Sequence, residues 1–311
     1  MIHGNDCYAI VKIWGCKMKD KLNGIIYKEY EPMSRHSTFR IGGEARYYIT
    51  PASIEQLLQA IHACKESNVP YVILGNGSNV LFLDEGYKGA VIAIGDAMSD
   101  ISIEDETIYA QAGAMLAKIS MLAKEHSLTG MEFASGIPGT IGGAIVMNAG
   151  AYGGEMKDIV VSVDLLEDDE IHTDSCEQMQ FAYRHSIVDA TKIVVGVKLR
   201  LKNGDYNQIV ARMEELKTAR VMKQPLEYPS AGSTFKRPEG YFAAKLIDDC
   251  GLRGFRVGGA MVSEKHCGFV VNYDHATAND VITLMDVVTK KVYETFQVTL
   301  EPEVKIIRCD L

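Results

Sequence analysis

A glycine-rich stretch places the strongest constraint on how this chain can fold. The stretch SGIPGTIGGAIVMNAG runs from residue 135 to residue 150, and five of its sixteen residues are glycine. It has neither the alternation of a surface strand nor the apolar stripe of an amphipathic helix. Because glycine lacks a Cβ atom, such a segment lets a ligand approach the backbone closely. The alternative interpretation is that these glycines only make tight turns and close packing contacts.

A second glycine-rich loop, GNGSN at residues 75–79, ends the apolar run YVILG, which predicts a buried strand at 71–75. Backbone N–H groups of such a loop can hold a phosphate. The loop is not a dinucleotide-binding G-x-G-x-x-G motif, because position 80 is Val80, and the Walker lysine pattern is also absent. The two stretches together favour a long phosphate-bearing ligand on a fold other than the Rossmann fold.

Charge and composition exclude several classes of function. The 311-residue chain has a formal net charge of −9, so we expect no nucleic-acid partner. We find no apolar run of membrane-spanning length and no secretory signal pattern. The seven cysteines form no C-x-x-C pair, which is typical of reduced cytoplasmic thiols and predicts neither a disulfide framework nor a metal site. We expect a cytoplasmic monomer, although no sequence feature establishes the oligomeric state.

Hydrophobic periodicity predicts a chain of mixed helices and strands. Met18 is an alternative initiator, and residues 1–17 are then an N-terminal extension that we expect to be mobile. The patterns predict helices at 54–67, 115–128, 206–225, 242–250 and 278–296, and strands at 71–75, 89–95, 107–113, 159–166, 170–175, 192–201 and 302–308.

Further motifs occur in register with the two glycine-rich stretches. They are STFRIGG (37–43), FAYRHS (181–186), SAGSTFKRP (230–238), GGAMVSEKHCGFVVN (258–272) and EPEVKII (301–307). Together they resemble the UDP-N-acetylenolpyruvoylglucosamine reductase family of the vanillyl-alcohol-oxidase-type FAD superfamily, over roughly residues 27–308. The short spacing between FAYRHS and SAGSTF resembles the shorter, type II branch, which lacks the insertion whose tyrosine covers the substrate in the longer branch.

This resemblance implies an α+β fold with a two-subdomain, PCMH-type, non-Rossmann FAD-binding module. Its subdomains are expected at residues 18–90 and 91–215, followed by a smaller α+β substrate-binding domain at 216–311. The implied activity is the reduction of UDP-N-acetylglucosamine enolpyruvate to UDP-N-acetylmuramate, a step of peptidoglycan synthesis that serves cell-wall biogenesis, cell shape and cell division. NADPH would reduce non-covalently bound FAD, and hydride would pass from flavin N5 to C3 of the enolpyruvyl group.

Two other functions stay open at this stage. One is another FAD oxidoreductase of the same superfamily that acts on a sugar or an alcohol. The other is a nucleotide-sugar-binding protein without catalytic activity, which needs the pocket but not the full set of catalytic residues.

Three residues match the catalytic positions of the family. Ser233 matches the proton donor to C2, although a serine in such a loop often only bonds its own turn. Arg184 matches the cation that holds the substrate carboxylate, for which a planar guanidinium is suited. Glu303 matches the catalytic carboxylate. Glu301 would share its side of a strand, so spacing alone does not choose between them. His185 is interpreted as a hydrogen-bonded loop histidine.

The resemblance also implies two sets of binding residues. For FAD they are Arg40, Gly75, Asn76, Gly77, Ser78, Asn79, Gly113, Ser135, Gly136, Gly139, Gly143 and Asn148. For the UDP-sugar they are Tyr241, Lys245, Lys265 and His266.

Overall fold

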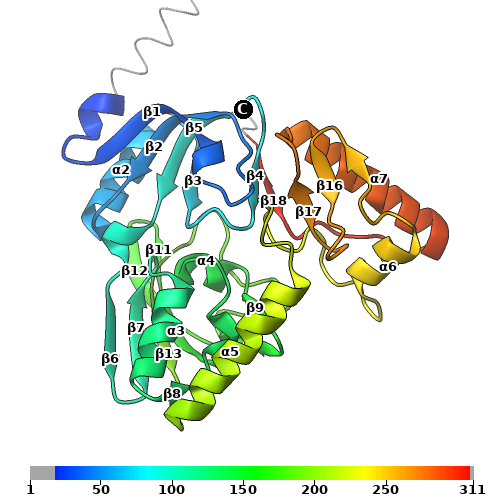
Figure 1. The fold of residues 1–311 in the computed structure, drawn as a ribbon. Coiled ribbons are helices and arrows are strands. Elements are labelled where there is room, and N and C mark those ends of the chain that lie inside the picture. Colours follow the sequence, from blue (N-terminus) through cyan, green and yellow to red (C-terminus); the bar gives the residue numbers. More distant parts are fainter. Residues whose placement is uncertain (1–17, 309–311) are drawn as a thin grey trace, which may run out of the picture.

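The computed structural model describes residues 18–308 (Figure 1). The N-terminal extension expected at residues 1–17 lies outside this range. Helices and strands are interspersed along the chain, which confirms the predicted α+β class. None of the helices between residues 18 and 308 is both long enough and apolar enough to cross a membrane.

A four-stranded sheet with the order β1-β2-β5-β3 forms the N-terminal part. Strands β2, β5 and β3 run parallel, and β1 pairs antiparallel with β2. The elements are β1 (Ile26–Pro32), β2 (Glu44–Thr50), α2 (Ile54–Glu66), β3 (Tyr71–Leu74), β4 (Val80–Phe82) and β5 (Tyr87–Ala93). Because parallel strands need a crossover connection, α2 carries the chain from β2 to β3. Its N-cap Ser53 accepts a hydrogen bond from the N–H of Gln56. The loop at 75–79 leaves the carboxyl end of β3.

The middle of the chain forms a five-stranded antiparallel sheet with the order β12-β11-β13-β7-β6, called here the middle sheet. Its strands are β6 (Ile101–Glu104), β7 (Thr107–Gln111), β11 (Val160–Glu167), β12 (Glu170–Ser175) and β13 (Ile193–Arg200). The buried residues Ile108, Val163 and Val197 belong to the main core. The opposite face is polar, because Tyr109 and Thr173 both donate hydrogen bonds to the carboxylate of Asp164.

Short elements connect these strands. They are α3 (Leu116–Glu125), α4 (Ile141–Val146), β8 (Leu128–Thr129), β9 (Gly150–Ala151), β10 (Gly154–Glu155) and β14 (Lys202–Asn203), with 3-10 helices at Met33–Arg35, Asp96–Met98, Glu132–Ala134 and Met156–Asp158.

The glycine-rich stretch of residues 135–150 contains a helix that its pattern did not predict. This helix, α4, is six residues long and begins at Thr140, whose hydroxyl accepts from the N–H of Gly143. Glycine is required inside it because a Cβ on Gly142 would lie 2.9 Å from the Cβ of Ala112. Residues 135–139 before α4 and 147–149 after it form no helix or strand, and Gly150 begins β9.

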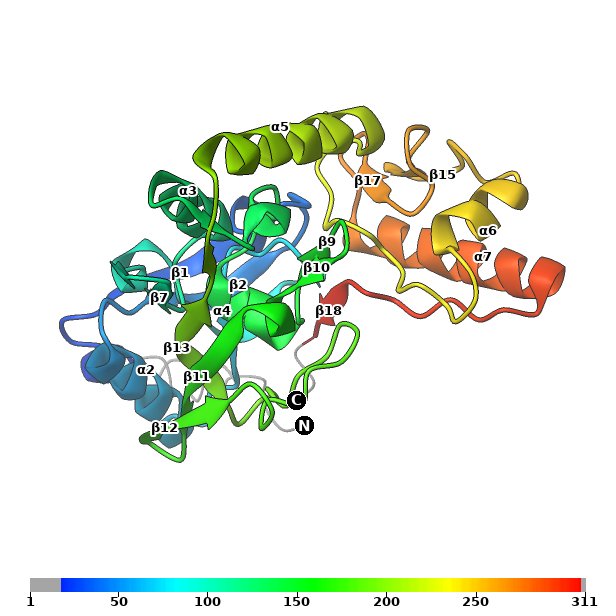
Figure 2. The ribbon, with the colours of Figure 1, turned by 90° about the horizontal axis from the view of Figure 1, so that it is seen from below.

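The C-terminal part has a three-stranded sheet and three helices. Its elements are α5 (Tyr206–Lys223), α6 (Ala243–Asp249), β15 (Arg256–Val257), β16 (Ala260–Val262), β17 (Val270–Asn272), α7 (Ala278–Phe296) and β18 (Lys305–Ile307). Helix α5 spans the space between the middle sheet and this part (Figure 2). Helix α7 buries Val281, Leu284, Val288 and Val292 in a second core. That core also holds Phe39, Ile41 and Leu81 from the N-terminal part.

The last strand returns to the beginning of the fold. Strand β18 pairs in parallel with β4, with Lys305 opposite Val80 and Ile307 opposite Phe82. Residues that are far apart in the sequence therefore lie side by side next to the loop at 75–79. The domain limits at 90/91 and 215/216 stay a prediction.

Candidate active site

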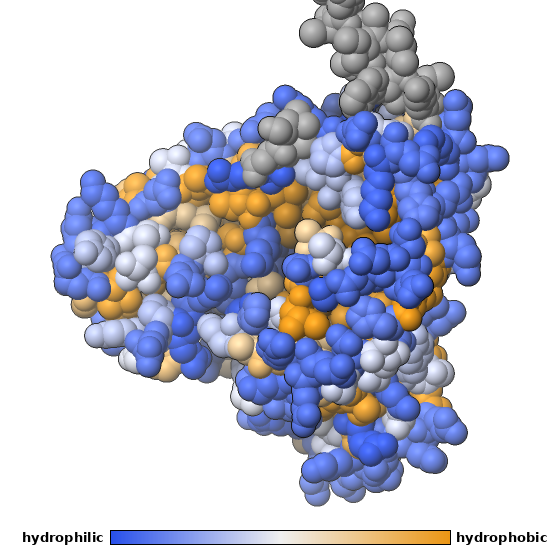
Figure 3. Space-filling model, turned by 180° about the vertical axis from the view of Figure 1, so that it is seen from behind, coloured by the Kyte–Doolittle hydropathy of each residue, from blue (hydrophilic) through white to orange (hydrophobic). Residues whose placement is uncertain are grey.

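One cavity of about 670 Å³ brings together the main part of the predicted site. It lies where the N-terminal part, the glycine-rich stretch and the C-terminal part meet. Figure 3 shows apolar residues gathered on the surface where the C-terminal part, on the left, joins the rest of the molecule. The predicted residues that line the cavity are Arg40, Gly75, Asn76, Gly77, Ser78, Asn79, Gly139, Gly143, Arg184, Ser233 and Glu303.

The two glycine-rich loops lie against each other in this cavity. The side-chain amide of Asn76 donates to the carbonyl of Pro138 at 2.7 Å. A Cβ on Gly75 would lie 2.4 Å from the hydroxyl oxygen of Thr140. Gly77 has a φ of +63°, and its Cβ would lie 2.0 Å from the carbonyl oxygen of His36. Only glycine satisfies both conditions at position 77.

The loop at 75–79 has backbone donors that are not used by the protein. Within residues 18–308, the N–H groups of Asn76, Gly77 and Ser78 donate to no protein acceptor. Backbone N–H groups without a protein acceptor are normally satisfied by a ligand or by water. Successive free N–H groups that line a cavity form a binding place for a phosphate.

Arg184 and Glu303 form an ion pair inside the cavity. Nε of Arg184 donates to Oε1 of Glu303 at 2.7 Å, and its Nη2 donates to the carbonyl of Gly150 at 3.2 Å. The side chains are 19% and 12% exposed. The other oxygen of Glu303, Oε2, is buried and has no hydrogen-bond partner within the described residues. An anionic oxygen left in this state is unfavourable, so it is suited to carry a proton or to meet a ligand donor.

Burial has the largest effect on the pKa of Glu303. Loss of solvent raises the pKa of Glu303, and the neighbouring cations Arg184 and Lys236 oppose this effect. The carboxyl group therefore holds a proton more readily than an exposed glutamate does.

The turn that carries Arg184 is held in an uncommon conformation. Ala182 and His185 exchange two backbone hydrogen bonds across it. Arg184 has a φ of +55°, in the left-handed region that bulky residues rarely adopt. The side chain of Asn148, which is fully buried, donates to the carbonyl of Ala182 at 3.0 Å. Such backbone conformations persist where surrounding contacts hold them, and they are common at functional sites.

Glu303 and Ser233 are positioned by the same hydrogen bonds. The N–H of Glu303 donates to the carbonyl of Thr234 at 2.8 Å, and Thr234 directly follows Ser233. Thr234 is itself fixed, because its hydroxyl accepts from the N–H of Val270 at 2.8 Å. No hydrogen bond engages the hydroxyl of Ser233 anywhere in the described part of the chain. This serine does not bond its own turn, so its hydroxyl is available to a ligand.

The structure also distinguishes Glu303 from Glu301. The side chain of Glu301 is 70% exposed, pairs with Lys236 at 3.2 Å and does not line the cavity. Glu303, in contrast, lines the cavity, with its side chain 12% exposed.

Some predicted flavin residues lie outside the cavity lining. They are Gly113, Ser135, Gly136 and Asn148. Gly113 packs closely, because a Cβ there would lie 2.1 Å from the carbonyl oxygen of Gly95. The hydroxyl of Ser135 donates to the carbonyl of Glu132 at 2.8 Å. A direct contact of these residues with FAD stays a prediction.

The four predicted substrate residues also lie outside the lining. They are Tyr241, Lys245, Lys265 and His266. Lys245 pairs with Asp249 at 2.9 Å, and Nζ of Lys265 donates to the carbonyl of Val221 at 2.7 Å. Burial lowers the pKa of His266, whose Nδ1 accepts from the N–H of Gly268. Contacts of these side chains with a UDP-sugar stay predictions.

Sequence reasoning did not identify several residues of the cavity wall. They include Thr38, Arg220, Gln224, Tyr228 and Lys305. Arg220 lies in the last turn of α5, within the helix predicted at residues 206–225, for which no ligand contact was predicted. Arg220 follows the apolar Leu216 by one helical turn, and this spacing places both residues on the same face of the helix.

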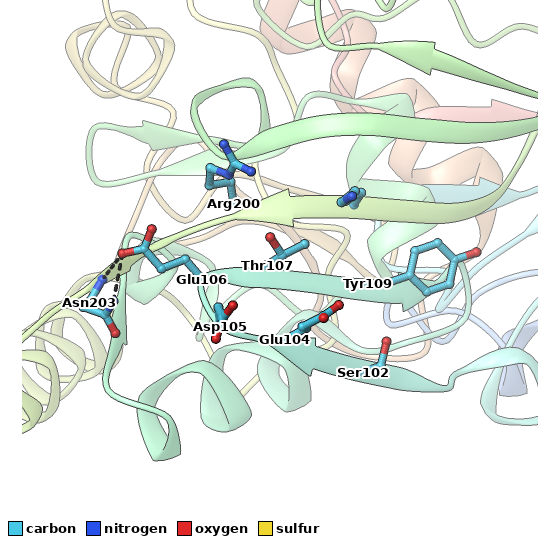
Figure 4. Close-up of a pocket in the computed structure, with 9 residues that line it drawn as sticks. Ser102, Glu104, Asp105, Glu106, Thr107, Tyr109, Arg200 and Asn203 are labelled. Carbon is cyan, nitrogen blue, oxygen red and sulfur yellow. Dashed lines mark hydrogen bonds between the residues drawn. The ribbon is translucent and has the colours of Figure 1, made fainter.

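A second cavity of about 700 Å³ lies away from all of these residues, on the polar face of the middle sheet. Figure 4 shows Glu106 receiving hydrogen bonds from Asn203, with Ser102, Thr107 and Tyr109 along neighbouring strands. None of the motif residues lines it, so the chemistry belongs to the first cavity.

Comparison with known proteins agrees with this arrangement. Residues 45–173 match a model for an FAD binding domain, and residues 224–307 match the C-terminal domain of UDP-N-acetylenolpyruvoylglucosamine reductase. The reductases of that name from Alkaliphilus oremlandii and Clostridioides difficile are 51% and 50% identical to this chain. Each alignment covers 89% of this chain and 92% of the relative. The chain belongs to the UDP-N-acetylenolpyruvoylglucosamine reductase family.

A solved structure supports the same assignment. The reductase of this family from Thermus caldophilus superposes with a TM-score of 0.80 at 35% identity, over 91% of this chain and all of that one. These matches confirm the family resemblance seen in the motifs and the predicted architecture, an FAD-binding module followed by a C-terminal domain. They also confirm the prediction of a flavin-dependent oxidoreductase.

The cavity of this family member fits an FAD group. Its free N–H groups at residues 76–78 suit the diphosphate, and its wall includes apolar side chains such as Ile73, Leu116, Ile137 and Val146 that suit a flat ring system. Glycine at positions 75 and 77 lets the loop pack against Thr140 and the carbonyl of His36, because a Cβ there would collide with them.

Proposed function

We propose that this protein reduces UDP-N-acetylglucosamine enolpyruvate to UDP-N-acetylmuramate, with NADPH as the reductant, in the cytoplasm and as a step of peptidoglycan precursor synthesis. The observation that carries the proposal is the meeting of three groups in the flavin-sized cavity: the Arg184–Glu303 pair, the unpartnered Oε2 of Glu303 and the free hydroxyl of Ser233. FAD, when bound in this cavity, would supply the two-electron redox chemistry that links NADPH to the vinyl ether.

Arg184 would stabilise the charge that develops on the substrate. Hydride addition at C3 leaves negative charge at C2, which spreads into the adjacent carboxylate. A guanidinium that is fixed before the reaction by Glu303 and the carbonyl of Gly150 needs little reorganisation to meet this charge. Its remaining donors suit the two oxygens of a carboxylate.

Ser233 would deliver the proton to C2. A serine hydroxyl is a weak acid, but a carbanionic C2 is a strong base, so position matters more than acidity. The fixed backbone of Thr234 next to it supplies that position. The added hydride and proton together account for the two hydrogens that the enolpyruvyl group gains.

Glu303 would act at the carboxylate end of the substrate. One of its oxygens orients Arg184, and the buried Oε2 can carry a proton that it shares with a substrate oxygen. The raised pKa of Glu303 supports this role, because a protonated carboxyl can donate a hydrogen bond that a carboxylate cannot.

The remaining assignments are proposals of the same kind. Tyr241, Lys245, Lys265 and His266 would approach the UDP-sugar from the C-terminal part, and the domain division at residues 18–90, 91–215 and 216–311 would separate flavin binding from substrate binding. Support for substrate access from this side comes from the wall at residues 224–233, which leads from α5 to Ser233.

An anaerobic experiment with two half-reactions tests the proposed function. The purified protein is reduced with NADPH and the flavin absorbance is followed, and the enolpyruvyl substrate is then added. We expect the flavin absorbance to bleach when NADPH is added and to recover fully when the enolpyruvyl substrate is added. A flavin that reoxidises with a simple sugar or alcohol, but not with the enolpyruvyl substrate, would instead identify another oxidoreductase of the superfamily.

A further inference from the structure

The cavity wall carries an excess of positive charge. Four cationic side chains and one carboxylate line it, in a protein whose formal net charge is −9. Arg184 is paired with the carboxylate, Glu303. Arg40 and Lys305 are solvent-exposed, so water can stabilise their charges. The fourth cation, Arg220, is in a different situation.

Arg220 is a partly buried cation without an anionic partner. It lies in the last turn of α5, one turn after the buried Leu216, so the helix turns it inward. No ion pair within residues 18–308 involves Arg220, and the ionisable group that acts on it is a phenol, that of Tyr152. Burial accordingly lowers the pKa of the Arg220 guanidinium. Removing a charge from water without a partner is unfavourable, and the structure gives no compensating carboxylate.

The protein fixes Arg220 next to the loop that lies against the phosphate-binding loop. Its Nη1 donates to the carbonyl oxygen of Gly136. The side chain of Arg220 packs closely on this position, because a Cβ on Gly136 would lie 3.0 Å from Cδ of Arg220. Residues 137–139 line the cavity directly after Gly136, and the carbonyl of Pro138 is bound by Asn76. One of the five N–H donors of the guanidinium is therefore used, and the others remain for a ligand.

We propose that Arg220 binds a phosphate group of a nucleotide held in this cavity. A phosphate neutralises the guanidinium and accepts two of its donors at once. The cavity can receive such a group from two sources, the diphosphate of FAD and the diphosphate of the UDP-sugar. The first source is supported by the fit of the glycine-rich loops to FAD. The second rests on the proposed function.

Direct binding measurements on the full-length protein distinguish these sources. The ligands are FAD and riboflavin added to flavin-free protein, and UDP added to FAD-loaded protein. Riboflavin keeps the ring system but has no phosphate, so it is an internal control. The variants are Arg220→Gln, which removes the charge but keeps an amide donor, and Arg220→Lys, which keeps the charge. Arg212→Gln is the matched control, because Arg212 lies on the same helix, is exposed and pairs with Glu215.

We expect Arg220→Gln to raise the Kd for one of the two phosphate ligands by about 10- to 100-fold, the range for a hydrogen bond to a charged group. A change with FAD assigns Arg220 to the cofactor, and a change with UDP assigns it to the substrate. Riboflavin affinity and the Arg212→Gln variant should stay close to wild type. Arg220→Lys should retain more phosphate-ligand affinity than Arg220→Gln.

Two results would overturn the proposal. One is a Kd within about twofold of wild type for both FAD and UDP in Arg220→Gln, well below the range expected for a charged contact. The other is an equal loss of FAD and riboflavin affinity in both Arg220 variants, which indicates that Arg220 only supports the loop at Gly136.

If Arg220→Gln does not fold, Arg220→Lys decides the question alone. It should weaken a phosphate ligand but not riboflavin, since an ammonium lacks the guanidinium's planar fork. No turnover is measured, so a failure of the proposed reductase activity would leave the FAD and riboflavin results intact.

Discussion

The side-chain amide of Asn79 donates to the main-chain carbonyl of Glu303 at 3.2 Å, and the N–H of Lys305 donates back to the carbonyl of Asn79 at 2.9 Å. These two bonds join the proposed flavin loop to the proposed catalytic carboxylate. The parallel pairing of β4 with β18 continues the same connection. The position of the Glu303 backbone relative to the flavin loop is therefore set by one bond from the side chain of Asn79 and one between main-chain groups.

Asn79→Ala should slow the reaction with the enolpyruvyl substrate more than it slows reduction by NADPH. The substitution leaves the carbonyl of Glu303 without its donor, which costs about 1–3 kcal/mol where the group is buried. Asn76→Ala is the matched variant, because the side-chain amide of Asn76 donates to the carbonyl of Pro138 and not to that of Glu303. Stopped-flow traces of the two half-reactions separate these effects. Equal rates for the two variants in the second half-reaction would contradict the proposed connection.

Ser233→Ala should leave NADPH-dependent flavin reduction near normal and block reoxidation by the enolpyruvyl substrate. Loss of a proton donor typically lowers the rate by about 10²–10⁴-fold. Ser102→Ala, on the polar sheet face, is the control. The same stopped-flow assay measures both steps, and a parallel decline of both would count against a proton-donor role.

Arg184→Ala should retain FAD and lose substrate reduction by about 10²–10³-fold, the range for one electrostatic group aimed at a developing anion. Arg184→Lys should recover only part of the activity, because an ammonium cannot bind Glu303 and a carboxylate in the same fork geometry. Flavin absorbance gives cofactor content, and steady-state assays give kcat. Full activity in Arg184→Ala would remove this residue from the site.

Gly77→Ala should abolish FAD binding and destabilise the fold. A left-handed φ costs a non-glycine residue about 1–2 kcal/mol, and here the new Cβ also meets the carbonyl of His36. Gly153→Ala is the matched control, because Gly153 has a φ of +90° and nothing within 4 Å of its Cβ position. Thermal unfolding and FAD titration should show a larger loss at position 77. Similar behaviour of both variants would mean that the close contact with His36 is unimportant.

Protein stability should depend on pH through Glu303. Burial raises the pKa of Glu303 above the ordinary 4.5, so the folded protein holds this proton more tightly than the unfolded chain does. Such a group contributes stability at pH values below 4.5, and the contribution is lost as the pH rises through the raised pKa. The free energy of unfolding of wild type should therefore fall relative to Glu303→Gln between about pH 4.5 and neutrality.

Urea unfolding across this pH range measures the difference. Glu301→Gln, at the exposed carboxylate two residues away, controls for the loss of one negative charge. A difference between wild type and Glu303→Gln that stays constant with pH would show that burial does not act on this group.

The sequence was most informative where chemistry requires a particular residue type. The bare backbone at Gly75 and Gly77 indicated a ligand loop, and the motifs around Arg184, Ser233 and Glu303 indicated the reaction, and all five line one cavity. Periodicity was less informative where it assumed a regular element. It placed Glu301 and Glu303 on one side of a strand, whereas in the structure Glu301 is exposed and Glu303 lines the cavity.

Tertiary contacts account for what the sequence could not show. The helix α4 is only six residues long, and its N-terminus depends on the cap from Thr140 and on packing against Ala112, neither of which appears as a periodic pattern. The sequence predicted the helix at residues 206–225 but assigned no contact to Arg220. Its inward position follows from how α5 packs against the segment at Gly136, which is 84 residues away in the sequence.

The pairing of β18 with β4 has a consequence for the order in which the site can assemble. Asn79 and Glu303 are separated by 224 positions, and contacts over such a separation form only after a large loss of chain freedom. The hydrogen bond between Asn76 and Pro138 spans only 62 positions, so forming it costs less chain entropy. During refolding, capture of the flavin should therefore precede the appearance of catalytic turnover, with a measurable lag between the two.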